Sequence, residues 1–251
     1  MWPHLGRKIF VANWKMNGSL AFAEAYGTFL YEQRATIPQG ACAIVCPPAP
    51  YLKAFCDAIQ GVAFLGIQNI AAASKGAFTG EISANMAKDI GCCYGLVGHS
   101  ERRHLYRESD AVVLEKMRRI TEAGLAPILC VGETEEQREG GRMEEALYQQ
   151  LCHVSSLGCI PGLIVAYEPV WAIGTGKTPT RANIQKACRV IHDILEAQEM
   201  HDVPFLYGGS VTAANAQDFL SLKEVQGVLV GGASVKADEF LAIIQHLDKI
   251  S

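Results

Sequence analysis

Short hydrophobic runs without internal alternation recur along the whole chain, and polar residues follow each of them. Runs of this length predict strands that are buried on both faces, as in parallel sheets covered by helices. The predicted strands span Lys8–Lys15, Cys42–Pro47, Ala63–Asn69, Tyr94–His99, Pro127–Gly132, Leu163–Glu168, Pro204–Tyr207 and Gly227–Val230.

The segments between these runs have the spacing of amphipathic helices. After Thr180, which can cap a helix, hydrophobic residues recur at i, i+4, i+7 and i+11, namely Ile184, Cys188, Ile191 and Leu195. Gly124 follows the helical stretch 111–123 in the position of a C-terminal cap. These signals predict that a helix packs against the sheet after each strand.

Eight strand–helix units in 251 residues predict a single closed parallel (β/α)₈ barrel, one domain over residues 1–251. A doubly wound open sheet is the alternative. The barrel is favoured because the strands end on one side only in Asn, Lys, His, Glu, Gly or Ser. In a barrel these carboxyl ends form one ring, where active sites of this fold lie.

Composition narrows the classes of function. Hydrophobic residues make up 49% of the chain, which favours a folded core over disorder. The chain has 22 basic and 26 acidic residues, and no basic run long enough to follow a nucleic-acid backbone, so a small ligand is expected rather than nucleic acid. No stretch of 18 apolar residues predicts a membrane span, and the first ten residues do not resemble an export signal. A cytoplasmic location is therefore expected.

The nine cysteines are expected to be reduced. Their number is odd, no C-x-x-C pair occurs, and Cys42, Cys46, Cys92 and Cys130 lie in apolar runs, as core residues do. Cys152 and His153 are adjacent but lack a second spaced pair, which makes a zinc site a poor interpretation.

Three predicted strands end in ionisable residues, which are unfavourable in a hydrophobic core unless they have a function. Lys15 ends the first strand, His99 the fourth and Glu168 the sixth. Each alone is commonly a solvated or structural residue, but the barrel would bring all three to one rim, where ionisable groups cluster at functional sites.

Two further features suit a phosphorylated substrate. The loop Pro169–Pro179 has an apolar middle, as a lid has, although an ordinary packed loop has the same composition. Gly208-Gly209 and Gly231-Gly232 follow the last two strands, where barrels bind phosphate through backbone amides, although single Gly-Gly turns are often only tight turns.

Several segments, in order along the chain, resemble the signature segments of the triosephosphate isomerase family. They are 13–17, 98–103, 166–176, 207–210 and 231–234. The resemblance implies interconversion of dihydroxyacetone phosphate and D-glyceraldehyde 3-phosphate through an enediol(ate), in glycolysis and gluconeogenesis, without metal or organic cofactor.

The resemblance also implies a role for each site residue. Glu168 would be the general base, His99 a neutral hydrogen-bond donor at the start of a helix, and Lys15 the positive charge beside the substrate oxygens. Asn13 would orient Lys15, and Glu101 would be the partner of Lys15 or a surface residue paired with an arginine. The residues expected to bind the phosphate are Gly174, Ser210, Gly231 and Gly232.

The segment from Gln68 to Glu81 resembles the loop that inserts into a twin subunit in this family, which implies a homodimer. Phe78 at its tip would otherwise be an unexplained apolar patch. Two other functions stay open: a different phosphosugar barrel enzyme, such as an epimerase or a Schiff-base aldolase that uses Lys15, and a catalytically silent barrel that serves as a scaffold.

Overall fold

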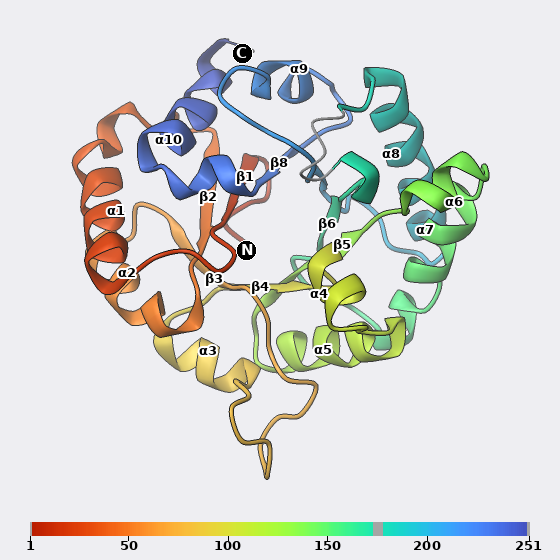
Figure 1. Cartoon of the computed structure of the whole chain (residues 1–251), viewed down its shortest axis with the longest axis horizontal. Coiled ribbons are helices and arrows are strands. Elements are labelled where there is room, and N and C mark those ends of the chain that lie inside the picture. Colours follow the sequence, from red (N-terminus) through yellow and green to blue (C-terminus); the bar gives the residue numbers. More distant parts are fainter. Residues whose placement is uncertain (1, 173–177, 250–251) are drawn as a thin grey trace.

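Parallel strands β1 to β8 close into a barrel in the computed structural model, which describes residues 2–172 and 178–249 (Figure 1). Each strand pairs with the next along the chain, and β8 closes the ring on β1. The strands are β1 (Lys8–Asn13), β2 (Ala41–Cys46), β3 (Phe64–Ile67), β4 (Tyr94–Val97), β5 (Ala126–Val131), β6 (Ile164–Tyr167), β7 (Phe205–Tyr207) and β8 (Gly227–Val230). The predicted fold class is confirmed.

Helices surround the barrel as an outer ring (Figure 1). The α-helices are α1 (Leu20–Glu32), α2 (Leu52–Ile59), α3 (Ala84–Ile90), α4 (Ser100–Leu105), α5 (Asp110–Glu122), α6 (Glu135–Glu139), α7 (Met143–Leu151), α8 (Arg181–Glu196), α9 (Ala216–Leu220) and α10 (Ala237–Gln245). Short 3₁₀ helices lie at Arg34–Thr36, Ala49–Tyr51, Val154–Leu157, Val170–Ala172, Gly232–Val235 and His246–Lys249.

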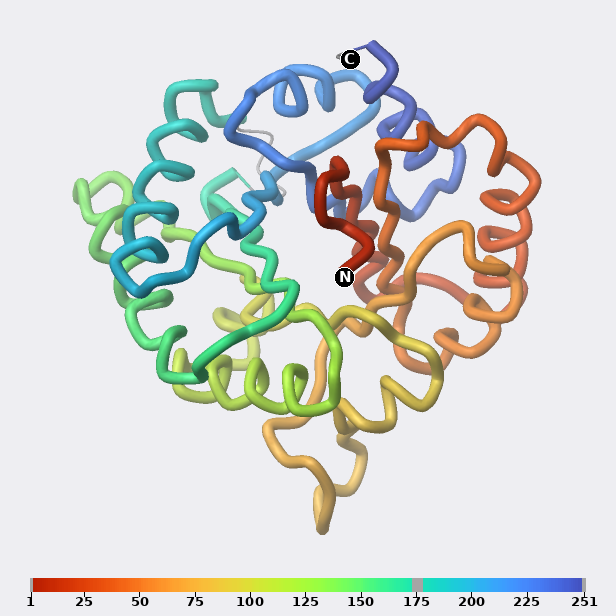
Figure 2. The backbone as a smooth tube through the Cα atoms, turned by 180° about the vertical axis from the view of Figure 1, so that it is seen from behind, coloured from red at the N-terminus to blue at the C-terminus, as the bar shows by residue number. Residues whose placement is uncertain are grey.

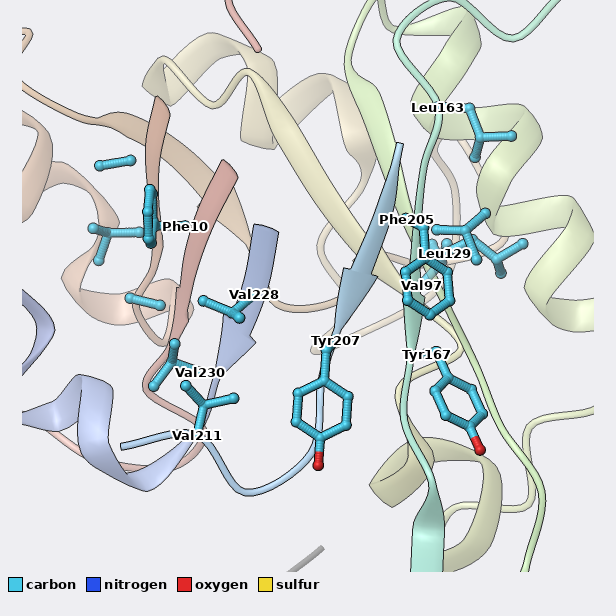
Figure 3. Close-up of a cluster of buried hydrophobic side chains, with 14 of the residues drawn as sticks. Phe10, Val97, Leu129, Leu163, Tyr167, Phe205, Tyr207, Val211, Val228 and Val230 are labelled. Carbon is cyan, nitrogen blue, oxygen red and sulfur yellow. The ribbon is translucent and has the colours of Figure 1, made fainter. Parts of the chain in front are cut away.

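Two hydrophobic clusters hold these layers together. The inner one fills the barrel with alternate strand residues such as Ile9, Val11 and Ile128. The outer one lies between strands and helices, and Figure 3 shows part of it, including Phe10, Val228 and Phe205. Both faces of each strand are therefore buried, which explains why the sequence shows continuous hydrophobic runs.

The predicted helix signals are confirmed at α8 and α5. Thr180 caps α8, and the four residues of the predicted stripe are buried. Gly124 follows α5 with φ +71°, where its N–H donates to the carbonyl of Thr121. A left-handed backbone of this kind is the usual reason for glycine after a helix.

The predicted carboxyl ends of several strands were too long. β1 ends at Asn13 rather than Lys15, β4 at Val97 rather than His99, and β6 at Tyr167 rather than Glu168. The chain turns out of the sheet at these points: Gly98 has φ +67° and Lys15 has φ +54°, neither of which a strand accommodates. The remaining ends, in β2, β3 and β5, fall one or two residues early in the same way.

All nine cysteines are free, and the four predicted core cysteines are buried. Burial raises the pKa of the Cys42 thiol to about 11 and that of Cys92 to about 12, because a thiolate is poorly solvated there. They are therefore protonated at neutral pH, as inert core residues are.

Two segments extend beyond the repeating units. The chain from residue 2 to residue 7 lies across the middle of the ring, as Figure 2 shows from behind. The loop between β3 and α3 projects away from the barrel (Figure 1). Among the helices that the structure describes, none is both long and apolar enough to cross a membrane.

Candidate active site

Glu168 and His99 meet at the carboxyl end of the barrel. Glu168 Oε1 lies 3.1 Å from His99 Nε2, and Glu168 Oε2 accepts a hydrogen bond of 2.9 Å from the backbone N–H of Ser100. Both side chains are buried, and Glu168 Oε1 accepts no hydrogen bond from the described part of the chain. The site thus contains a buried carboxylate with an oxygen still available for a proton.

His99 stands at the N-cap position of α4, which fixes the orientation of its ring. The backbone N–H of Glu101 donates to His99 Nδ1 over 3.3 Å. Because Nδ1 accepts this bond, the proton of a neutral ring lies on Nε2, which faces Glu168. The imidazole can therefore donate a hydrogen bond into the site.

Lys15 follows β1 in a left-handed backbone conformation that is rare for a residue with a side chain. Two side chains hold it there: Asn13 Oδ1 accepts from the Lys15 N–H at 3.0 Å, and Gln68 Nε2 donates to the Lys15 carbonyl at 2.9 Å. The Lys15 ammonium lies 2.6 Å from Glu101 Oε1. Strain of this kind persists only where the surroundings fix it, as at functional sites.

The glycine turns after β7 and β8 border the same rim. Gly231 lies so close to Lys15 that a Cβ atom there would be 3.3 Å from Lys15 Cε. Gly232 has open space around its Cα and begins the short helix Gly232–Val235. Ser210 Oγ donates to the carbonyl of Ala172 at 2.9 Å. Gly174 lies outside the described residues.

The predicted lid also lies only partly within the described residues. The stretch Val170–Ala172 forms a 3₁₀ helix, in which Trp171 and Ala172 are buried. Whether the loop Pro169–Pro179 moves as a lid stays a prediction.

Two residues of this region were not among the predicted site residues. Gln68 bonds both Lys15 and the carbonyl of Cys46, and so ties β1, β2 and β3 together at the rim. Glu133 is fully buried and accepts from Tyr167 Oη at 3.0 Å and from Trp171 Nε1 at 2.8 Å. Polar residues within two positions of the ends of β3 and β5 were the signal that could have identified them.

A groove of about 530 Å³ opens beside these residues. Asn13, Lys15, His99 and Glu101 line one part of it, and Met16 and Tyr106 lie among the other lining residues. It is large enough for a small phosphorylated molecule or for part of a neighbouring chain.

A carboxylate, an imidazole and an ammonium on the carboxyl rim of a closed parallel barrel, next to two glycine turns, define a (β/α)₈-barrel enzyme for a small phosphorylated substrate. The sequence model of the triosephosphate isomerase family matches residues 8–247. The chain belongs to this family.

Individual relatives agree with this assignment over almost the whole chain. A triosephosphate isomerase from Thiobacillus denitrificans is 46% identical over 250 residues, which cover 97% of this chain and 99% of the relative. One from Bordetella pertussis is 44% identical over 240 residues, covering 94% and 96%. One from Hahella chejuensis is 43% identical over 244 residues, covering 95% and 98%.

Proposed function

We propose that this chain, as one barrel domain over residues 1–251, interconverts dihydroxyacetone phosphate and D-glyceraldehyde 3-phosphate in the cytoplasm, in glycolysis and gluconeogenesis. Membership of the triosephosphate isomerase family supports the reaction. The observation that carries the assignment of roles is the placement of the buried Glu168 carboxylate 3.1 Å from His99 Nε2 at the barrel rim.

Glu168 acts as the general base. Its carboxylate removes a proton from the carbon next to the substrate carbonyl and returns it to the neighbouring carbon, while the hydroxyl proton passes from one substrate oxygen to the other, so that ketose becomes aldose without a net change in protons. Glu168 Oε2 accepts from the Ser100 N–H, and Oε1 faces His99. To reach the substrate carbon, the carboxylate therefore turns away from these partners when substrate enters.

His99 and Lys15 stabilise the enediol(ate). Neutral His99 donates from Nε2 to the oxygen on which negative charge develops, and the Lys15 ammonium faces the same oxygens. Asn13 and Gln68 hold the backbone of Lys15, and Glu101 fixes both the ammonium and the imidazole. These groups are in place before the charge develops, so little reorganisation opposes the reaction.

Backbone amides bind the phosphate. Gly231 and Gly232 leave the room that a phosphate needs for close approach to the chain, and Lys15 adds a charge next to them. Ser210 and Gly174 contribute on the side of the loop Pro169–Pro179, which closes over the substrate and keeps water from the enediolate.

The test is a coupled assay with glyceraldehyde 3-phosphate in the presence of a chelator. We expect full activity in the wild type, because none of the proposed steps uses a metal. Glu168→Asp should lower kcat by about 10²-fold or more, because a carboxylate about one bond length further away no longer reaches the carbon. KM should change much less.

Two results would contradict the proposal. Undiminished turnover in Glu168→Asp would exclude Glu168 as the base. Trapping of substrate on Lys15 by borohydride would identify a Schiff-base aldolase instead, since an isomerase forms no imine with its lysine.

We also infer that two copies of the chain associate through the loop from Gln68 to Glu81. Phe78 in this loop is 54% exposed, and the groove beside Lys15 contains the exposed Met16 and Tyr106. An exposed aromatic side chain on a projecting loop and a groove with apolar residues such as Met16 and Tyr106 fit a symmetric pair in which each loop enters the groove of the other chain. Each active site would then be completed by its twin.

A further inference from the structure

Gln150 on α7 forms a two-point clamp on the backbone of Gly132, which directly follows β5. Gln150 Oε1 accepts from the Gly132 N–H at 2.8 Å, and Gln150 Nε2 donates to the Gly132 carbonyl at 2.9 Å. Gly132 is buried, and its N–H and carbonyl have no other hydrogen-bond partner among the described residues. The side-chain amide of Gln150 therefore supplies the two hydrogen bonds that a neighbouring strand would otherwise form with Gly132.

Gly132 in turn lies directly against the backbone of Glu168. A Cβ atom on Gly132 would be 1.9 Å from the carbonyl oxygen of Glu168, so the two backbones are in close contact. Hydrogen bonds flank this contact on both sides: Glu168 N–H donates to Val131 at 2.7 Å, and Val170 N–H donates to Glu133 at 3.1 Å. Residues 131–133 thus form the surface on which residues 168–170 rest.

We propose that Gln150 is a positioning residue for the catalytic base, acting through the peptide of Gly132. This inference rests on the proposed role of Glu168. In the proposed mechanism the Glu168 side chain swings about its Cα to reach the substrate. The point that its carboxylate reaches is therefore set by the position of that Cα in the backbone. Gln150 fixes that backbone from outside the barrel, since α7 belongs to the outer ring of helices (Figure 1).

The physical reason is the cost of leaving a buried peptide unpaired. Without the Gln150 amide, the Gly132 N–H loses its acceptor and the Gly132 carbonyl loses its donor, and the peptide turns or shifts to reach water or other partners. Because Gly132 has no space between itself and Glu168, a shift of a few tenths of an ångström is passed on to the base. Proton abstraction is sensitive to displacements of this size.

The decisive variant is Gln150→Met, which keeps the length of the side chain and removes both hydrogen bonds. Its matched control is Gln149→Met, because the Gln149 side chain is exposed and, within the described residues, forms a hydrogen bond only with Glu145. We expect kcat of Gln150→Met to fall by about 10-fold or more. KM and the inhibition constant of inorganic phosphate should stay within about twofold of the wild type, because Gly231 and Gly232 are untouched.

A second readout separates positioning from loss of stability. With substrate deuterated at the transferred position, the isotope effect on kcat should rise in Gln150→Met, because proton abstraction becomes slower than the other steps. Gln150→Glu keeps the acceptor for the Gly132 N–H but lacks the donor for the carbonyl. Its kcat should therefore lie between that of the wild type and that of Gln150→Met. It also decides the question if the methionine variant does not fold.

An unchanged kcat in a folded Gln150 variant, or equal losses of kcat and phosphate affinity, would overturn the proposal. Failure of the proposed function would look different, because the wild-type protein and Gln149→Met would then lack isomerase activity as well.

Discussion

His4 is a titratable side chain buried at the opposite end of the barrel from the active site. It is 1% exposed, and its Nδ1 lies 3.0 Å from Tyr94 Oη. Burial lowers the pKa of His4 from 6.5 to about 4, because the imidazolium loses its solvation. The folded protein therefore holds His4 uncharged well below neutral pH.

This burial makes folding stability dependent on pH. Between about pH 6.5 and 4 the unfolded chain binds a proton at His4 that the folded chain does not, so stability falls as pH falls through this window. The resulting loss of unfolding free energy reaches about 3 kcal/mol near the lower end of this pH range. Above pH 6.5 His4 is neutral in both states and the effect disappears.

We predict that His4→Gln weakens this acid sensitivity. Glutamine stays neutral, so the loss of unfolding free energy between pH 7 and pH 4.5 should be smaller in the variant than in the wild type. Urea unfolding at a fixed protein concentration measures the difference, with the exposed His201→Gln as control. Identical pH profiles for the wild type and His4→Gln would show that the burial of His4 does not govern acid stability.

The residues of the candidate site could be recognised in the sequence because each follows a strand. Lys15, His99 and Glu168 stand out as ionisable residues at the ends of apolar runs, and the structure brings His99 and Glu168 within 3.1 Å. Gln68 and Gln150 could not be recognised in this way. They act on backbone groups 53 and 18 residues away, and no local pattern encodes such contacts.

At the scale of elements, α8 is the helix that begins directly after the loop Pro169–Pro179. Thr180 Oγ1 accepts from the Asn183 N–H, and Asn183 Oδ1 accepts from the Thr180 N–H, each at 3.2 Å. This reciprocal cap satisfies two backbone donors at the start of the helix. It also fixes the point at which the loop rejoins the barrel.

We predict that Thr180→Ala lowers the free energy of unfolding by about 1 kcal/mol, because the Asn183 N–H loses its acceptor. Thr180→Ser keeps the hydroxyl and should lose much less. Chemical denaturation of both variants tests this. Equal stability of the alanine and serine variants would mean that water replaces the cap at no cost.

The elements also show where sequence patterns lose accuracy. Continuous hydrophobic runs located all eight strands, because both faces of a parallel barrel strand are buried. The carboxyl ends were misplaced because buried residues continue past the last residue of the strand, as at Trp14, which is fully buried after β1 has ended. Burial and strand pairing are separate properties, and only burial is visible in the composition of a run.

At the scale of the whole molecule, several large hydrophobic side chains are exposed near the carboxyl end of the barrel. Met16 is 96% exposed, Leu105 75% and Tyr106 67%, and Phe78 lies on the loop that projects beyond the barrel (Figure 1). Met16 and Tyr106 line the groove beside Lys15 at the active-site rim. Covering this face would bury apolar surface and close the groove beside Lys15 at the same time.

We therefore predict that the wild-type protein sediments as a dimer at low micromolar concentration and that Phe78→Glu shifts it toward the monomer, because a charge would be buried in the twin's groove. kcat should fall together with the dimer fraction, since in the proposed dimer the twin loop would cover the groove that contains Lys15, Asn13 and His99. Tyr148→Glu is the matched control: Tyr148 is also aromatic and 59% exposed, but it lies on α7, away from the loop. A wild type that sediments as a monomer with full activity would contradict the dimer, whereas equal losses in both variants would show that the effect does not depend on the loop.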